Sequence, residues 1–255
     1  MSSTSVTSRL YIEGDSVVHR LPAQCKLVAA FGFVLAMVAT PRAQFWAFGA
    51  YAGLLAAVAL AAAVPAPTIA RRTLVETPFV AFAALLPFVA AGEQVQLLGV
   101  GLSEPGLLGA WNILAKATLG VVAAVLLAAT TRPQALVAGL ARLHLPPLVV
   151  QIMSLMVRYV DVVAAEQSRM RIARESRGFV ASDVRQLGVL GRSTAALFVR
   201  SYERGERVHL AMLSRGYAGA LPAPASAPPR ADQWLVAALV PAATTAVACL
   251  AWTAS

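Results

Sequence analysis

Five long apolar runs constrain this chain more than any other feature of its sequence. They cover residues 27–40, 43–64, 74–91, 107–131 and 234–252. A bilayer core of about 30 Å needs roughly 20 helical residues, within a range of about 17 to 25. The first run is short for this purpose, so we expect residues 21–26 to join it. The pattern predicts an all-α integral membrane protein with about five transmembrane helices.

Composition excludes two other broad classes. Hydrophobic residues make up 58% of the 255 residues and charged residues 13%, whereas a soluble domain carries about 25% charge. A water-soluble globule of this size would have too little polar surface, and a disordered chain would be far less apolar. The two cysteines, Cys25 and Cys249, are too few and too far apart for a disulfide framework or a zinc site.

A basic segment between the fourth and fifth runs differs from the rest of the chain. Residues 132–231 hold 14 of the 21 basic residues and six acidic ones, and their pattern is amphipathic. With the N-terminus inside, 19 basic residues fall on the inner side, and only Arg42 lies outside. The positive-inside rule therefore places the N-terminus and this segment in the cytoplasm of a multi-pass protein of the cell inner (plasma) membrane.

These features divide the chain into four expected parts. An N-terminal membrane region with about four transmembrane helices covers residues 1–131, and a cytoplasmic domain of long amphipathic coupling helices covers residues 132–221. A linker of Pro, Ala and Ser follows over residues 222–231, and a last transmembrane helix over residues 232–255. Within the cytoplasmic domain we expect helices over 133–143 and 148–177, and a third that Ser182-Asp183 caps.

An internal repeat within the basic segment is the most specific motif. Residues 172–179 read IARESRGF, and residues 210–217 read LAMLSRGY. Each copy lies at the expected end of a helix, where glycine can close the helix in the left-handed conformation and the aromatic residue can fold onto the last turn. Arg177 and Arg215 then lie at the negative end of a helix dipole, on a rigid tip.

Two matching copies favour a binding function over ordinary helix capping. Capping requires only the glycine, whereas the copies also agree at Ala, Ser, Arg and the aromatic position. A guanidinium group offers several donors in a fixed fork, which suits carboxylates and carbonyls of a partner. Two equivalent ends on one chain indicate a partner that comes in two copies, and an ATPase dimer is the natural candidate.

The familiar sequence patterns of catalytic and nucleotide-binding sites are absent from this chain. The sequence contains no G-x-x-x-x-G-K-[ST], G-x-S-x-G or H-E-x-x-H pattern. Its three histidines lie in separate segments without metal-ligand spacing, so we interpret them as interfacial or core polar residues: His19, His144 and His209.

Two charged residues lie in or near the apolar runs. We expect Lys116 to snorkel or pair rather than to mark a pathway, and Glu76 to cap a helix or pair with Arg72.

The whole chain resembles the transmembrane T component of energy-coupling-factor (ECF) transporters, most closely the CbiQ type linked to cobalt uptake. The family signature is a short arginine motif at the end of each of two coupling helices, which Ser176-Arg177-Gly178 and Ser214-Arg215-Gly216 match. Further similar segments are Arg158-Tyr159-Val160-Asp161, Arg200-Ser201-Tyr202-Glu203-Arg204, and His19-Arg20-Leu21-Pro22 with Lys26-Leu27.

The resemblance implies a division of labour among subunits. Two CbiO-like ATPase subunits use ATP and Mg²⁺, and a CbiM-like S component, sometimes with a small CbiN-like subunit, binds Co²⁺ or, less often, Ni²⁺. This chain would bind no cofactor or metal, would contact lipid but no nucleic acid, and would be non-catalytic. Its ATPase-binding residues would be Ser176, Arg177, Gly178, Phe179, Ser214, Arg215, Gly216 and Tyr217.

Other functions remain open on the sequence alone. Related T components serve vitamins, so the cargo need not be a metal, and the ATPases could be dedicated or shared. More distant alternatives are a self-contained secondary carrier and a polytopic membrane enzyme. Uptake by the purified chain, alone and then with an ATPase pair, separates these classes.

Overall fold

The computed structural model describes residues 11–90, 94–97, 100–179, 187–219 and 229–254. Contacts within the chain group these residues into two compact units. The membrane unit comprises the described residues of 11–139 and 226–255, and the coupling unit those of 140–225. The expected cap at Ser182-Asp183 and most of the expected linker, residues 222–228, lie outside the described residues.

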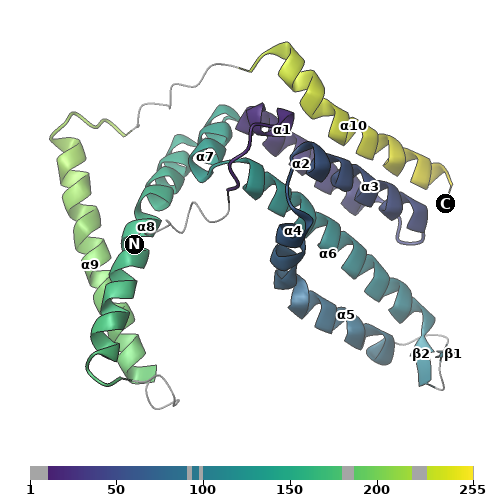
Figure 1. Ribbon diagram of the computed structural model, residues 1–255, viewed down its shortest axis with the longest axis horizontal. Coiled ribbons are helices and arrows are strands. Elements are labelled where there is room, and N and C mark those ends of the chain that lie inside the picture. Colours follow the sequence, from purple (N-terminus) through teal and green to yellow (C-terminus); the bar gives the residue numbers. More distant parts are fainter. Residues whose placement is uncertain (1–10, 91–93, 98–99, 180–186, 220–228, 255) are drawn as a thin grey trace. The chain divides into compact units, whose positions relative to one another are not determined.

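The membrane unit is built almost entirely of helices (Figure 1). A short helix precedes two apolar helices of 17 residues, and a bent helical stretch and two long helices complete the unit. In chain order these elements are α1 (Val17–Arg20), α2 (Ala23–Ala39), α3 (Phe45–Ala61), α4 (Ala66–Thr73), η1 (Leu74–Glu76), α5 (Thr77–Val89), α6 (Glu104–Thr130) and α10 (Ala231–Thr253). α7 (Pro133–Arg142) leads from α6 to the coupling unit.

Prolines explain where the chain breaks its helices in this region. After α3, Ala63 adopts a positive φ of 52°. Pro65 stands at the N-cap of α4, where the amide that proline lacks takes no part in the helical hydrogen bonds. Pro78 lies in the first turn of α5, directly after the 3-10 turn η1. Together α4, η1 and α5 form one bent stretch that begins at Ala66, eight residues before the apolar run that predicted it.

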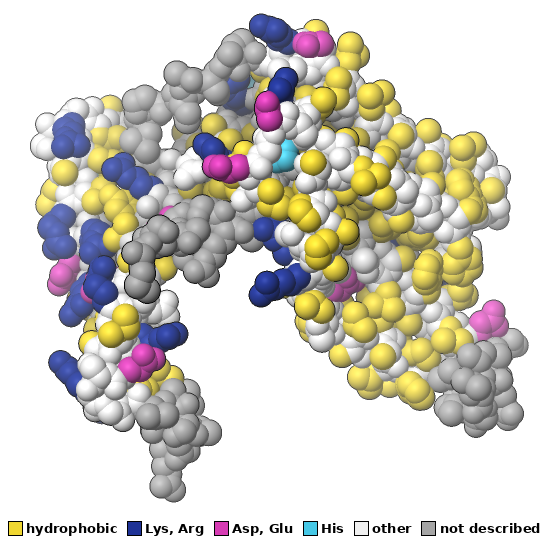
Figure 2. Space-filling model, viewed as in Figure 1, with side chains coloured by type: hydrophobic (Ala, Val, Ile, Leu, Met, Phe, Trp, Pro, Cys, Tyr) yellow, Lys and Arg dark blue, Asp and Glu magenta, His cyan; other side chains and the backbone are white. Residues whose placement is uncertain are grey.

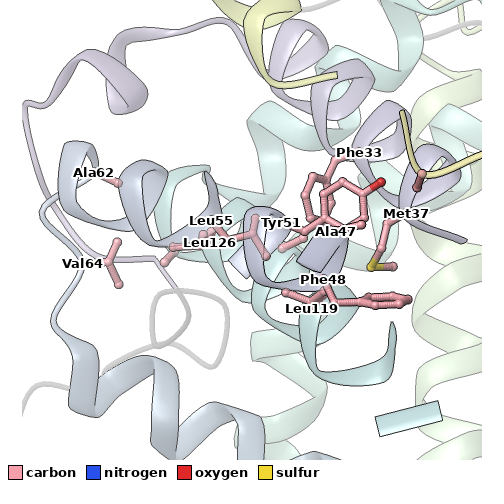
Figure 3. Close-up of a cluster of buried hydrophobic side chains, with 13 residues drawn as sticks. Phe33, Met37, Ala47, Phe48, Tyr51, Leu55, Ala62, Val64, Leu119 and Leu126 are labelled. Atoms are coloured by element: carbon pink, nitrogen blue, oxygen red, sulfur yellow. The ribbon is translucent and has the colours of Figure 1, made fainter. Parts of the chain in front are cut away.

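The membrane unit surrounds an apolar core between α2, α3 and α6 (Figure 3). The aromatic residues contributed by α2 and α3 pack edge to face: the ring centroids of Phe33 and Tyr51 lie 6.0 Å apart, and those of Phe48 and Tyr51 6.2 Å. Leu119 and Leu126 of α6 complete the cluster. This burial fixes the three helices against one another.

Polar groups inside the membrane unit satisfy helix ends. Lys116 of α6 donates from Nζ to the carbonyl oxygens of Val38, at 2.8 Å, and Thr40, at 3.1 Å, at the end of α2. Of the two expected alternatives, snorkelling and pairing, the ammonium of Lys116 pairs, and its partners are backbone carbonyls. Glu76 is buried and accepts a hydrogen bond from Thr118 Oγ1 at 2.8 Å. Of the two expected alternatives for Glu76, a helix cap or a pair with Arg72, the cap does not form: Glu76 stands at the N-cap of α5, but its side chain makes no capping hydrogen bond there.

The helix ends alternate as expected for an up-and-down bundle. At one end, Lys26 near the start of α2 donates to the carbonyl of Thr130 at the end of α6, at 2.8 Å. At the other end, Trp252 near the end of α10 donates to the carbonyl of Ala39 at the end of α2, at 3.0 Å. The start of α2 and the end of α6 therefore share one side, and the ends of α2 and α10 share the other.

A short hairpin joins α5 to α6. β1 (Gln94–Leu97) pairs with β2 (Val100–Ser103) in antiparallel register, with Gln94 opposite Ser103 and Leu97 opposite Val100. This stretch lies between the third and fourth apolar runs of the sequence, at 74–91 and 107–131. Ser103 then caps α6, because its Oγ accepts from the amide of Gly106.

The coupling unit contains two long helices, α8 (Pro147–Glu175) and α9 (Leu187–Leu213). None of the residues of α8 is buried, and none of the described side chains of α9 is buried either. By length and composition alone it could also cross a membrane, as could Ala66–Val89, α6 and α10. The structure confirms the predicted fold class, an all-α membrane protein to which the hairpin is a small addition.

Candidate partner-binding site at two helix ends

The first arginine end, residues 172–179, closes α8 with a complete Schellman motif. Gly178 has a φ of +78°, and its amide donates to the carbonyl of Glu175 at 3.0 Å. The amide of Phe179 reaches back to the carbonyl of Arg174 at 3.1 Å. These two bonds satisfy carbonyls that a helix end otherwise leaves unpaired, so the chain turns sharply directly after Arg177.

The second arginine end, residues 210–217, repeats this geometry at the end of α9. Gly216 has a φ of +81°, and its amide donates to the carbonyl of Leu213 at 3.0 Å. The amide of Tyr217 donates to the carbonyl of Met212 at 3.1 Å. The two ends are thus equivalent bond by bond, and the predicted helix closure by a left-handed glycine is confirmed at both.

The serine of each motif has a local role that the sequence analysis missed. Ser176 Oγ donates to the carbonyl of Ala173 at 3.1 Å, and Ser214 Oγ donates to the carbonyl of Ala211 at 3.0 Å. Each serine therefore satisfies one more carbonyl of its last turn. The two copies of the repeat both carry serine here, and this agreement is the sequence signal from which a shared side-chain hydrogen bond could have been predicted.

The arginines between serine and glycine are presented to solvent. Arg177 and Arg215 are both exposed, and within the described parts of the chain neither side chain forms an ion pair. The neighbouring acid, Glu175, pairs with Arg171 at 3.1 Å instead. Both guanidinium groups therefore stand exposed at helix ends, where the helix dipole favours a positive charge.

The aromatic residues of the two ends differ in their contacts. At the first end the guanidinium carbon of Arg174 lies 5.9 Å from the ring centroid of Phe179. At the second end the hydroxyl of Tyr217 donates to Oε1 of Gln151, on α8, at 2.5 Å. The ring of Tyr217 also meets that of His209 edge to face, with centroids 6.4 Å apart.

An ion-pair cluster joins the two helices farther along. Glu166 of α8 accepts from Arg169 and from Arg200 of α9, both at 2.6 Å. These hydrogen bonds, first that of Arg169 and then that of Arg200, lower the pKa of the Glu166 carboxyl below its ordinary value. Within α9, Glu203 pairs with Arg207 one turn later, at 4.0 Å.

The two arginine ends lie at opposite ends of the helix pair. Gln151, near the start of α8, meets Tyr217 just beyond α9, whereas Glu166 meets Arg200 inside α9, so the helices are antiparallel. At 1.5 Å per residue, the helix from Gln151 to the end of α8 separates the two ends by about 40 Å. Figure 2 shows many of the Lys and Arg side chains gathered over this unit.

Comparison with known proteins identifies the family. The CbiQ family, described as cobalt transport protein, matches residues 14–224. The chain is 30% identical over 233 residues to the energy-coupling factor transporter transmembrane protein EcfT of Bacillus selenitireducens, covering 82% of each protein.

Two further relatives agree with this assignment. The EcfT of Thermanaerovibrio acidaminovorans is 28% identical over 85% of each protein. The cobalt transport protein CbiQ of Rhodobacter capsulatus is 30% identical over 148 residues, 55% of this chain and 61% of that protein. The chain therefore belongs to the CbiQ family and is a transmembrane T component of an energy-coupling-factor transporter.

Proposed function

We propose that this T component transmits ATP-driven motion from two CbiO-like ATPase subunits to a CbiM-like S component, with a small CbiN-like subunit as a further partner. The ATPase subunits hydrolyse ATP with Mg²⁺, and this chain performs no chemistry. The observation that carries the proposal is the pair of matching, exposed ends of α8 and α9, each of which presents one arginine.

Each arginine end occupies a groove of one ATPase subunit in this proposal. The Schellman closures hold Arg177 and Arg215 on rigid tips, and the remaining motif residues surround them: Ser176, Gly178, Phe179, Ser214, Gly216 and Tyr217. A separation of about 40 Å along a stiff helix pair suits a two-subunit partner with one groove per subunit. When ATP closes the dimer, the grooves move, and the helices carry that displacement as levers.

The arginines of α9 support a cytoplasmic place for the coupling unit. Arg192, Arg200 and Arg204 occupy α9 alongside α8. One arginine at the centre of a bilayer costs about 2.5 to 3.5 kcal/mol even by insertion scales. Although α8 alone has the composition of a span, the helix pair as a whole therefore suits the cytoplasmic side of the inner membrane. This agrees with the positive-inside count.

We propose Co²⁺ as the cargo, bound by the S component. The support is the description of the matching family and the name of the Rhodobacter capsulatus relative, both of which specify cobalt transport. Ni²⁺ or a vitamin would be the cargo if the S component that copurifies with this chain has other ligands. Co²⁺ uptake by the purified complex in liposomes, with Ni²⁺ as competitor, distinguishes these cargoes.

Recruitment of the ATPase pair tests the role of the arginine ends. Loss of an arginine buried in a partner groove costs about 2 kcal/mol or more, which weakens binding roughly 30-fold. We expect Arg177→Ala with Arg215→Ala to abolish copurification of the ATPase subunits and Co²⁺ uptake. The matched control, Arg192→Ala with Arg207→Ala, removes two exposed arginines of the same unit and should retain both.

Two results would overturn this function. If the Arg177→Ala, Arg215→Ala chain still copurified with the ATPase pair and supported uptake, the ends would not be the binding site. If the wild-type chain alone accumulated Co²⁺ in liposomes without ATP or partners, it would be a self-contained carrier instead.

A further inference from the structure

The two arginine ends are alike in their backbone but are braced differently. The first end is stabilised within its own last turn, where Arg174 lies over the ring of Phe179. The second end is tied to the other helix, because the Tyr217 hydroxyl donates to Gln151 in the second turn of α8. Tyr217 and Gln151 are 66 residues apart in the chain.

A groove makes this contact consequential for the position of the second end. Between the Tyr217–Gln151 contact and the Glu166 cluster, α8 and α9 line an open groove with a volume of about 370 Å³. Its lining includes Tyr159 and Val163 of α8 and Gly205 and Val208 of α9. The two helices do not pack closely across this space. The position of the start of α8 against the end of α9 therefore depends on the hydrogen bond between Tyr217 and Gln151 at its edge.

The contact also shortens the path by which force could travel. Along the covalent chain, Arg215 is linked to the start of α8 by the whole of α9, the connection between α8 and α9, and the whole of α8. Through the Tyr217 hydroxyl, a displacement of Arg215 reaches the second turn of α8 directly, and four residues separate the end of α7 from the start of α8. The hydrogen bond between Tyr217 and Gln151 therefore links the second arginine end to the start of α8, the part of that helix that follows α7 in the chain.

We propose that Gln151 and Tyr217 are positioning residues that brace the second arginine end against the start of α8, so that the two ends are unequal parts of the coupling machinery. Among the described residues, the bracing contact of the first end is the local one between Arg174 and Phe179. The effect of the brace on coupling rests on the proposed function. The brace itself, the hydrogen bond between Tyr217 and Gln151, is a property of the chain alone. Loss of the brace leaves the arginine exposed but allows the second end to move relative to α8.

A distance measurement on the full-length chain tests the brace without partners. Spin labels at Ser154→Cys and Ala218→Cys, in a Cys25→Ala, Cys249→Ala background in nanodiscs, report the separation of α8 from the second end. We expect a narrow distribution that Tyr217→Phe or Gln151→Leu broadens, because losing one neutral hydrogen bond changes the docked population about five-fold. Gln151→Glu keeps an acceptor oxygen and should restore the narrow distribution.

Controls separate loss of the brace from general loosening of the unit. Labels at Ser168→Cys and Ala196→Cys lie near the Glu166 cluster, and their distance should not change in Gln151→Leu. Phe179→Leu, the matched change at the first end, should leave the Ser154–Ala218 distance unaltered. An unchanged Ser154–Ala218 distribution in both Tyr217→Phe and Gln151→Leu would overturn the proposal.

A second measurement tests the consequence for coupling in the assembled complex. We expect Gln151→Leu to retain the ATPase pair but to raise the ATP hydrolysed per Co²⁺ imported about five-fold, with Gln151→Glu near wild type. An unchanged ratio, despite a broadened distance, would overturn the role in coupling. If instead the Arg177→Ala, Arg215→Ala complex still assembled, the proposed function would fail while the distance result stood.

Discussion

At the residue scale, each arginine end combines a glycine that closes the helix with a serine that bonds to the last turn and an exposed arginine between them. Gly178 and Gly216 supply the left-handed φ, and Ser176 and Ser214 satisfy a carbonyl one turn earlier. These local features follow from spacing, so the sequence could predict the closures. The contact between Tyr217 and Gln151 could not be predicted, because it joins residues far apart in the chain and depends on how two helices pair.

Alanine at either closing glycine should destabilise that helix end. An L-residue in the left-handed region costs about 1 to 2 kcal/mol, although the space around both glycines is open. We expect Gly178→Ala to speed hydrogen exchange of the amides of residues 177–179 about ten-fold. Gly191→Ala, which lies within α9 in open space, is the matched control and should slow exchange in its own turn. Equal protection in Gly178→Ala and wild type would contradict this account of the closure.

At the element scale, the apolar runs predicted the membrane helices well except where polar residues belong to a helix. The runs at 43–64 and 107–131 correspond to α3 and α6. The third run did not include α4, because the polar residues Thr68, Arg71 and Arg72 interrupt the apolar pattern in the helix that follows Pro65. The antiparallel register of α8 and α9 also escaped prediction, since periodicity shows which face is apolar but not which helix covers it.

Acid should weaken the pairing of α8 and α9 through Glu166. Its pKa is lowered in the folded chain, so the ion pair contributes stability above the ordinary pKa of glutamate, about 4.3, and loses it as the pH falls through the lowered value. We expect spin labels at Ser168→Cys and Ala196→Cys to show a narrow distance at pH 7 that broadens below about pH 4. Glu166→Gln is the control and should remove this pH dependence; a transition that persists in Glu166→Gln would assign it to another group.

At the scale of the whole molecule, the membrane unit and the coupling unit differ in the side chains that they bury and expose. The first has an apolar core and satisfied helix ends suited to a bilayer. The second presents charged, exposed helices and two matching ends. The contacts of the membrane unit show which helix ends share a side, and the proposed cytoplasmic place of the coupling unit rests on the positive-inside count.

Cysteine accessibility in whole cells tests this orientation. In a background without Cys25 and Cys249, a membrane-impermeant maleimide should label Ala254→Cys from outside. It should label Leu148→Cys and Ser168→Cys only after permeabilisation. The last two positions flank much of α8, so labelling of one but not the other from outside would show that α8 crosses the membrane. The cysteine-free chain sets the background of the measurement.

Crosslinking in the assembled transporter tests the central claim most directly. A cysteine-reactive photocrosslinker at Ser176→Cys or at Ser214→Cys lies next to one arginine each, and the same probe at Ala196→Cys serves as the control on α9. The account predicts that both tip positions capture an ATPase subunit in the purified complex, that a chain carrying both probes captures two subunits at once, and that Ala196→Cys captures none. Capture of no ATPase subunit from either tip, with Ala196→Cys capturing one, would contradict it.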